Sequence, residues 1–266
     1  MPELPEVETI ARSLRPELTG RAVQAAHLLW RRTLAIPSPE RFADQIRGRE
    51  ITGVGRRAKY LDIQLADLHL FIHLRMSGDL YLRPLPYRPE KHDRLILELS
   101  DGRALVFNDT RKFGRVWLTA HPGDVIGGLG PEPFDPAFTL QEFYDRLLRH
   151  RRQVKPLLLD QSFLAGLGNI YTDEALHLAG LHPLRISDTI TFEEAARLYH
   201  AIQTVLMAGI EHNGASIDWV YRGGDFQNYF RAYGREGEPC PKCGTPIERL
   251  IVGQRSTHIC PQCQVT

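Results

Sequence analysis

The sequence predicts an α+β protein with an N-terminal helix and antiparallel β-sandwich, then a helical domain, then a cysteine-rich C-terminal segment. Apolar residues recur at helical spacing near the start, alternate with polar residues between positions 61 and 107, and recur at helical spacing after position 139. All four cysteines lie beyond position 239. A chain of 266 residues is long enough for two domains and a small appended segment.

The first half of the chain is expected to form one helix followed by strands. Val7, Ile10, Ala11 and Leu14 have the spacing of one apolar helix face, and we expect this helix to end near Gly20.

Alternating apolar residues then indicate strands at 61–65 and 68–76. The sequence Ser100-Asp101-Gly102 predicts a hairpin turn between strands at 95–99 and 105–107. Because such strands have one apolar face, we expect them to pack as an antiparallel sandwich or barrel against the first helix.

The second half of the chain is expected to be helical. A Gly/Pro-rich stretch at 127–133 is the best candidate for a linker. Thr139 with Glu142, and Thr191 with Glu194, have the spacing of capping boxes at the starts of two helices. These boundaries predict three domains: 1–131, 132–236 and 237–266.

Composition indicates a soluble globular protein, with 42% hydrophobic and 24% charged residues. We see neither a membrane-spanning run nor a secretory signal, so we expect a cytoplasmic location with reduced thiols.

The net charge of +1 does not indicate a nucleic-acid partner. Short basic runs occur at 149–155, 56–59 and 111–112. Such runs usually form part of the solvent-exposed surface, but each of these lies in or beside a motif described below.

The cysteines predict one structural zinc ion. They form two C-x-x-C pairs, Cys240 with Cys243 and Cys260 with Cys263. This is the spacing of a closed four-cysteine site, which leaves no coordination position for a substrate. The alternatives are two disulfides, which a reducing compartment disfavours, or free thiols, which the paired spacing disfavours. Because so short a segment buries little apolar surface, the metal is expected to supply its folding energy.

The chain start suggests an amine nucleophile. If Met1 is removed, Pro2 carries a free secondary amine, whose pKa of about 7.7–8.0 leaves part of it neutral near pH 7. Glu3 and Glu6 follow within one turn as possible acid/base groups. The alternative is a plain helix start, because proline and glutamate both suit a first turn.

A glycine-rich turn suggests a phosphate site. Gly166 and Gly168 allow a close approach of the backbone, and Asn169 is placed to cap a helix running to about residue 179. A helix N-terminus attracts phosphate, although a plain connection between helices explains the pattern equally well. The basic residues Arg151 and Lys155 just upstream favour binding of a nucleic-acid backbone.

Four further positions have a functional and a structural interpretation. Arg111 and Phe113 lie on a loop bounded by turn residues, and Met76 lies at the end of a predicted strand. Together they are interpreted as a wedge that fills a duplex after a base has left it, and the alternative for Met76 and Phe113 is core packing. Arg255 lies at an expected hairpin turn between the cysteine pairs, either solvated or in contact with a phosphate.

Taken together, these motifs resemble the formamidopyrimidine-DNA glycosylases along the whole chain. The resemblance rests on the N-terminal Pro-Glu-Leu-Pro-Glu-Val-Glu, segment 55–61, loop 108–114, the Gly-x-Gly-Asn turn and the four-cysteine finger, in this order. It implies a helix–two-turns–helix domain and a bifunctional enzyme that removes oxidised purines from duplex DNA and cuts the abasic site by β,δ-elimination. Leu4 favours this branch over the oxidised-pyrimidine enzymes, which usually open Pro-Glu-Gly-Pro.

The resemblance also implies roles for individual residues. Pro2 is expected to be the nucleophile, Glu3 the acid/base group, Lys59 the residue for β-elimination and Arg255 the residue for δ-elimination. Met76, Arg111 and Phe113 match the void-filling triad, Asn169 a phosphate ligand, His92 a DNA contact and Glu6 a second active-site carboxylate. With Arg151 and Lys155 from the basic run, the expected DNA-binding residues are Glu6, Met76, His92, Arg111, Phe113, Arg151, Lys155 and Asn169.

Other expectations concern the loop, the partners and the rival functions. A lesion-capping loop is expected within 221–229, with Gly223-Gly224 as a hinge, and Thr110 stands where many members of the family carry proline. The expected partner is damaged double-stranded DNA, bound by a monomer, with the bacterial nucleoid as the location. The alternatives are an oxidised-pyrimidine glycosylase and a catalytically silent zinc-finger DNA-binding protein.

Overall fold

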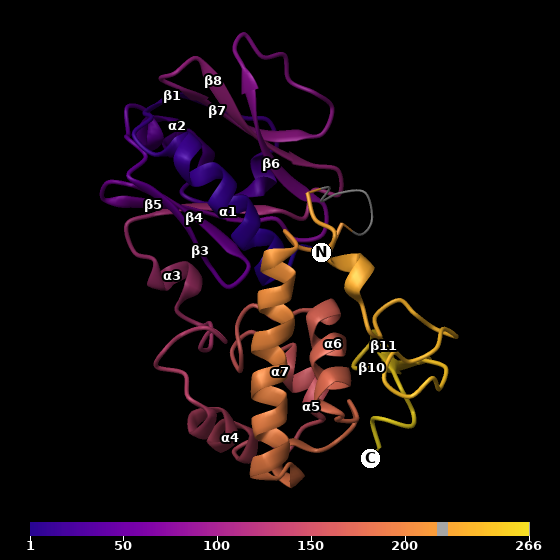
Figure 1. The fold of residues 1–266 in the computed structure, drawn as a ribbon. Helices are drawn as coiled ribbons and strands as arrows, with labels where there is room; N and C mark the ends of the chain where they lie inside the picture. Colours follow the sequence, from indigo (N-terminus) through magenta and orange to yellow (C-terminus); the bar gives the residue numbers. More distant parts are fainter. Residues whose placement is uncertain (217–222, 266) are drawn as a thin grey trace. The chain divides into compact units, whose positions relative to one another are not determined.

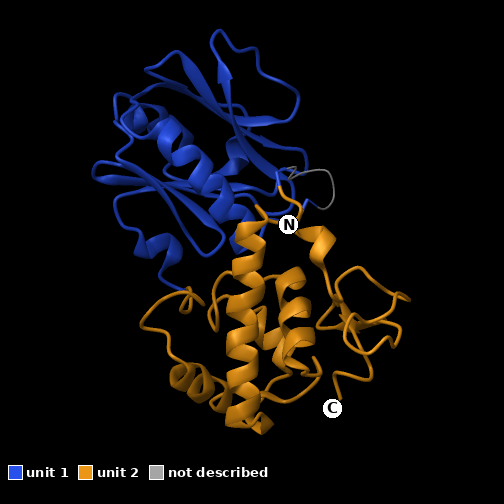
Figure 2. Cartoon of the chain, in the orientation of Figure 1, with its two compact units in different colours: residues 1–128, 216–223 blue, residues 129–215, 224–266 orange. Residues whose placement is uncertain are grey.

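The computed structural model describes residues 1–216 and 223–265, which fall into two compact units (Figure 2). Among these residues, no helix is both long enough and apolar enough to cross a membrane. Unit 1 comprises Met1–Gly128 and Ser216–Gly223, and unit 2 comprises Leu129–Ala215 and Gly224–Thr266.

The unit boundary after Gly128 lies inside the predicted linker. The segment 237–266 packs as part of unit 2 instead of forming a compact unit of its own. Positions 217–222 of the chain, which hold the beginning of the expected lesion-capping loop, lie outside the described residues. The end of that loop forms the short 3-10 helix η3 (Phe226–Tyr229).

Unit 1 begins with the predicted helix α1 (Leu4–Leu18). Glu3 is its N-cap residue, and Thr19 follows its last residue. The buried face of α1 includes Val7, Ile10 and Leu14, as the sequence spacing predicts. The other helices of this unit are α2 (Pro39–Ile46) and α3 (Gly123–Ile126).

The strands of unit 1 form a four-stranded and a five-stranded sheet (Figure 1). The first sheet has the order β1 (Val23–Leu28), β7 (Asp93–Leu99), β8 (Arg103–Asp109), β6 (Gly78–Pro84). The second has the order β2 (Leu34–Ile36), β9 (Arg115–Thr119), β5 (Leu68–His73), β4 (Tyr60–Leu65), β3 (Gly53–Arg57).

The predicted antiparallel sandwich is confirmed. Neighbouring strands are antiparallel except for the short β2, which pairs parallel with β9. One apolar core contains residues of both sheets and of helices α1 and α2, including Leu14, Phe42, Leu70 and Leu97. The predicted hairpin turn at Ser100–Gly102 joins β7 to β8.

Unit 2 contains the predicted helices and a small hairpin, and helices α6 and α7 lie side by side (Figure 1). Thr191 and Glu194 form the reciprocal capping box at the start of α7, whereas at α4 the Thr139 hydroxyl accepts the Glu142 N–H. The elements are α4 (Leu140–Leu148), α5 (Val154–Leu158), α6 (Asn169–Ala179), α7 (Phe192–Glu211), β10 (Glu248–Val252) and β11 (Arg255–Ile259).

Gly209 permits the close packing of α7 on α6. A Cβ atom at Gly209 would lie 2.5 Å from Cε1 of the fully buried Tyr171. We expect Gly209→Ala to lower the stability of the protein by about 1–3 kcal/mol, because overpacking a tight contact outweighs the better helix propensity of alanine. Thermal unfolding followed by circular dichroism measures this loss.

The matched control for Gly209 is Gly123→Ala in α3, where a Cβ atom meets nothing within 4 Å. This variant should unfold at the wild-type temperature. Equal melting temperatures for the wild type and both variants would show that the Gly209–Tyr171 contact does not require glycine.

Candidate functional site

Two buried carboxylates lie at the start of unit 1. Glu3 and Glu6 are each only 2% exposed, and the Glu3 backbone N–H donates a 2.7 Å hydrogen bond to the Glu6 carboxylate. Pro2 is buried beside them, whereas Met1 is exposed. Acidic residues in an ordinary first turn remain solvated, because burial of a charge is costly. The burial of Glu3 therefore exceeds what a helix start requires.

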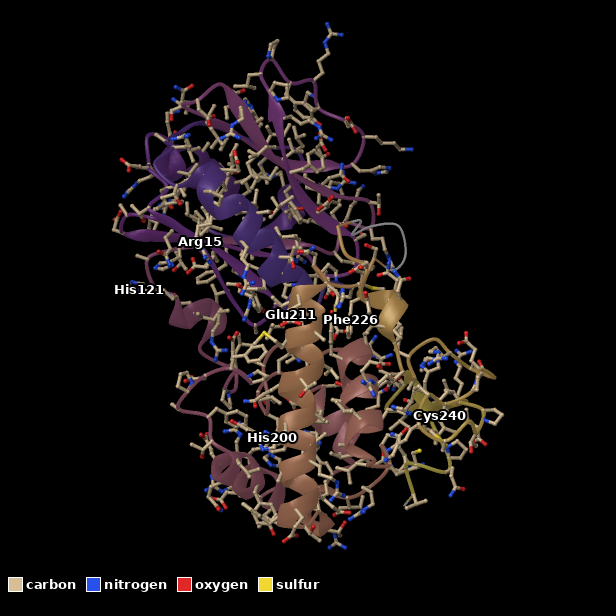
Figure 3. The ribbon with its side chains drawn as sticks, in the orientation of Figure 1. Arg15, His121, His200, Glu211, Phe226 and Cys240 are labelled. Atoms are coloured by element: carbon tan, nitrogen blue, oxygen red, sulfur yellow. The ribbon has the colours of Figure 1, made fainter. Side chains whose placement is uncertain are left out.

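Lys59 lies in the tight turn between β3 and β4 and is 5% exposed. This hairpin is held against α1, because Arg56 forms a 2.7 Å ion pair with Glu8 and Arg15 donates to the Val54 carbonyl at 2.7 Å. Figure 3 labels Arg15 on α1. The same helix therefore begins at the buried carboxylates and supports the strand that leads to Lys59.

His73, at the end of β5, is a neutral neighbour of this lysine. Burial lowers the pKa of His73 to about 3, and the positive charges of Arg75 and Lys59 contribute to this lowering. Its Nδ1 accepts a 3.0 Å hydrogen bond from the Arg75 backbone N–H. His73 thus adds no positive charge beside Lys59 at neutral pH.

Asp109 organises the loop that carries Arg111 and Phe113. It is fully buried and accepts hydrogen bonds from the Ser77 hydroxyl, from the Arg111 N–H at 3.1 Å and from the Gly114 N–H at 2.7 Å. The Arg111 N–H also lies 3.1 Å from the Ser77 hydroxyl. Because Ser77 follows Met76 in the chain, this network brings the three predicted wedge residues to one region of unit 1.

Two of the three wedge residues are exposed apolar side chains. Met76 is 41% exposed and Phe113 is 50% exposed, so neither is a core residue. The Arg111 guanidinium lies 5.0 Å from the centre of the Phe113 ring, within cation–π distance. The core alternative for these positions is therefore wrong.

His92 lies beside a buried arginine that sequence reasoning missed. Its Nδ1 is 3.4 Å from the Arg94 guanidinium, and Arg94 donates a 2.8 Å hydrogen bond to the Asp109 carbonyl. Asp93, also missed, is 2% exposed and accepts hydrogen bonds from Tyr87 and from the Glu90 N–H, at 2.9 and 2.7 Å. The sequence gives no signal that Asp93 and Arg94 are buried, since charged residues within a strand usually face water.

Asn169 differs from its expected role in unit 2. Gly168 is the N-cap of α6 and Asn169 is the first helical residue, and the Asn169 Oδ1 accepts no hydrogen bond from any described residue. Its amide Nδ2 instead donates to the Ser256 carbonyl at 2.9 Å. The prediction of a side-chain cap is wrong, because the neighbouring hairpin offers the amide a partner that the sequence does not reveal.

Lys155 also requires a correction. It is fully buried, and its ammonium donates to Asp173 at 2.5 Å, to the Ser256 carbonyl at 3.0 Å and to the Thr257 hydroxyl at 2.8 Å. An ammonium with these partners inside the protein is not available to a DNA phosphate. The structure therefore assigns Lys155 to the packing of α5 and α6 against the β10–β11 hairpin.

Arg255 and Arg151 lie on the surface of unit 2, as phosphate contacts require. Arg255 begins β11 directly after a two-residue turn, in which Gly253 and Gln254 have positive φ angles of 54° and 62°. Positive φ at both turn positions is typical of a type I′ hairpin. The Arg151 side chain is 89% exposed, and its Nε is 4.0 Å from Asp188.

The four cysteines form a metal centre without disulfides. Their sulfur atoms all lie within 4.8 Å of one another, and Cys243 Sγ lies 3.4 Å from Cys260 Sγ and 3.4 Å from Cys263 Sγ. These separations exceed a disulfide bond length of about 2.05 Å. A tetrahedral zinc site with Zn–S bonds of about 2.3 Å has sulfur atoms about 3.8 Å apart, which the cluster fits. The disulfide alternative is therefore wrong.

Burial and neighbouring sulfur atoms keep at least one of the four thiols protonated near pH 7 when no cation is bound. Hydrogen bonds from Thr245 and Cys260 lower the pKa of Cys243 to about 6, whereas burial and the neighbouring sulfur atoms raise the pKa of Cys263 to about 12. A divalent cation is needed to keep all four groups as thiolates near pH 7.

Removing the metal should unfold the finger. Its small buried cluster consists of Ala232, Ile247, Cys240 and Cys260, with Cys263 partly buried against it. We expect a chelated sample to lose hydrogen-exchange protection at 240–263 and to bind DNA more weakly, while α6 and α7 stay protected. Unchanged protection and DNA affinity after complete zinc removal would contradict a structural metal.

The fold and the site define a zinc-finger protein of the DNA-repair enzyme class. The family models match the formamidopyrimidine-DNA glycosylase N-terminal domain at 1–116, its H2TH domain at 129–220 and the zinc finger found in FPG and IleRS at 237–265. The chain belongs to the formamidopyrimidine-DNA glycosylase family.

Individual relatives match over the full length of the chain. The formamidopyrimidine-DNA glycosylase of Herpetosiphon aurantiacus is 50% identical, and the match covers 99% of this chain and 100% of that protein. The formamidopyrimidine-DNA glycosylase of Chloroflexus aggregans is 48% identical, and the match covers 100% of this chain and 99% of that protein. MutM in complex with carbocyclic 8-oxo-G DNA is 35% identical with a TM-score of 0.93. Lactococcus lactis Fpg in complex with N7-benzyl-Fapy-dG DNA is 35% identical with a TM-score of 0.94. Both structures cover 100% of either chain.

Proposed function

We propose that this protein removes 8-oxoguanine and formamidopyrimidine lesions from duplex DNA and then cleaves the abasic site. The observation that carries this proposal is that the Glu3 carboxylate is buried directly after Pro2 in the chain. Once Met1 is removed, the Pro2 nitrogen is the terminal amine. An amine beside an acid/base group can form and resolve an imine with a sugar. The relatives with solved structures bind 8-oxo-G and Fapy-dG DNA, which favours purine lesions.

The damaged nucleotide must leave the base stack before it can react. Extruding a base costs a few kcal/mol, which substitute side chains in the vacated space offset. Met76 and Phe113 are exposed apolar groups of the required kind, and Arg111 lies over the Phe113 ring. We assign this void-filling role to these three residues, and to His92 a contact with DNA beside them.

The covalent chemistry is assigned to the chain start. The Pro2 nitrogen gives up its proton and forms a bond to C1′ of the damaged nucleotide while the bond from C1′ to the base breaks. The bond from C1′ to the ring oxygen O4′ then breaks as O4′ takes a proton, which leaves an iminium between Pro2 and the open sugar. Glu3 moves protons between the sugar and its leaving groups, with Glu6 as the second carboxylate. β-Elimination and then δ-elimination release the sugar and leave phosphates at both ends of the gap, with Lys59 assigned to the first and Arg255 to the second.

The remaining cations and polar groups are assigned to the DNA backbone. Arg151 and Arg255 are exposed on unit 2 and suit phosphate contacts. The Asn169 amide nitrogen carries two hydrogens, of which one is donated to Ser256, so a phosphate would take the other.

We place this activity in the bacterial cytoplasm at the nucleoid. A structural zinc ion is held by Cys240, Cys243, Cys260 and Cys263.

Borohydride trapping tests the function on duplexes that contain 8-oxoguanine, thymine glycol or an abasic site. Preferential trapping on 8-oxoguanine opposite cytosine is the expected result. Preferential trapping on thymine glycol would instead indicate an oxidised-pyrimidine enzyme. Absence of any adduct, including with the abasic site, would leave a DNA-binding protein without this chemistry.

A further inference from the structure

His177, in the last turn of α6, is a buried imidazole that the proposed chemistry does not use. It is 3% exposed, and its Nε2 lies 3.3 Å from Sγ of the zinc ligand Cys240. Among the described residues, its Nδ1 has no hydrogen-bond partner, although that atom is buried. A polar side chain in this position needs a physical reason, because an unsatisfied buried polar atom is costly.

The position of the ring determines which nitrogen carries the proton. A zinc-bound thiolate has lone pairs only, so the group that faces it must donate. A neutral imidazole with its proton on Nε2 meets this requirement and leaves only an acceptor at the buried Nδ1. The opposite tautomer would place a lone pair against the sulfur and bury an N–H without an acceptor. The Lys242 backbone N–H is a second donor to the same sulfur, at 3.4 Å.

His177 completes a row of finger contacts along one face of α6. Asn169, Asp173 and His177 are four residues apart, so their side chains lie on the same face of the helix. Asn169 donates to the Ser256 carbonyl, and Asp173 accepts the His258 N–H at 2.9 Å. The first two contacts hold the hairpin, and the third reaches the metal centre itself.

We propose that His177 is a positioning residue for the zinc site, which donates an N–H···S hydrogen bond to the Cys240 thiolate and slows loss of the metal. A closed zinc site with four thiolate ligands carries excess negative charge, which each N–H donor reduces. Groups that hydrogen-bond to a metal ligand also fix its orientation, and their loss typically weakens metal binding by about 10–100-fold. The contact further joins the metal centre to the helix that begins at Asn169.

The test uses the full-length protein and reads the metal, so it does not depend on glycosylase activity. His177→Phe removes the donor and keeps a ring, whereas His177→Gln places an amide N–H near the position of Nε2. We expect His177→Phe to lose zinc to a chelating dye about 10-fold faster or more, and His177→Gln to stay close to the wild type. His200→Phe, at an exposed histidine of α7, is the matched control and should not change the rate.

Cobalt substitution separates the hydrogen bond from simple packing. The hydrogen bond stabilises the sulfur lone pair, so its removal in His177→Phe should shift the sulfur-to-cobalt charge-transfer band to lower energy. Equal release rates and bands for wild type and His177→Phe would overturn the proposal. Equal defects in His177→Phe and His177→Gln would also overturn it, because ring packing would then explain the effect.

A measurement on the unaltered protein covers the case in which the variants fail to fold. With ¹¹³Cd in the site and ¹⁵N-labelled histidine, the His177 Nε2 proton should show a scalar coupling to the metal across the hydrogen bond. A His177 side chain that is protonated on Nδ1 instead, or that shows no such coupling, would refute the proposal.

Discussion

Pro2→Gly is expected to slow release of 8-oxoguanine by about 100-fold while leaving affinity for a duplex with an abasic-site analogue unchanged. Glycine is small enough for Met1 to be removed, so the variant keeps an amine but loses the ring that fixes the nitrogen. Misplacement of a reacting group by about 1 Å can cost a factor of about 100. Single-turnover base release and borohydride trapping measure the chemistry, and a binding titration measures the affinity.

Two checks accompany this experiment. Mass spectrometry of each purified protein must show that Met1 has been removed, because the mechanism requires the free amine at Pro2. Pro5→Ala, in the first turn of α1, keeps that amine and should trap like the wild type. Unchanged base release together with loss of the borohydride adduct would exclude the amine of residue 2 as the nucleophile and would leave the helix-starting role of Pro2 as the whole explanation.

Lys155→Met should lower the stability of the protein by about 3–5 kcal/mol. Lys155 and Asp173 are both fully buried, and their ion pair has an N–O distance of 2.5 Å. Removing one partner leaves an uncompensated charge in the interior, which costs much more than the pair itself contributes. Urea unfolding monitored by circular dichroism measures the loss. DNA binding should also weaken, because the same ammonium holds Ser256 and Thr257 beside Arg255.

The double variant Lys155→Met/Asp173→Asn tests the cause. A neutral amide at position 173 removes the buried charge and can still accept the His258 N–H, so most of the lost stability should return. Arg151→Met makes the same kind of change at an exposed position, and its stability should differ from the wild type by less than about 0.5 kcal/mol. Equal losses from Arg151→Met and Lys155→Met would contradict a buried ion pair at Lys155.

Local patterns in the sequence were sufficient for much of the fold. Helical spacing predicted α1, and Gly180, with φ of 71°, ends α6 where the sequence places the stop. The hairpin around Ser100–Gly102 and the capping box of Thr191 also follow from short-range rules. Such rules concern residues close in the chain, so they hold whatever the tertiary packing is.

Contacts between distant residues were not predictable in this way. The sequence could not show that Lys155 lies next to Thr257, or that Asn169 reaches Ser256. A lysine inside a basic run has the same local signature whether it contacts DNA or pairs with a buried carboxylate. Only the packing of α6 on β11 decides between the two.

The sequence by itself determined the chemistry that is available to this protein. It specified a proline whose nitrogen becomes an amine once Met1 is removed, two neighbouring carboxylates, four cysteines at zinc-binding spacing and a family whose motifs occur in the same order. The tertiary structure decided which side chains are exposed and which are used internally. Met76 and Phe113 are on the surface, whereas Lys155 and His177 are buried. The reason is physical, because exposure and pairing depend on atoms brought together from distant parts of the chain, and local sequence patterns do not record those contacts.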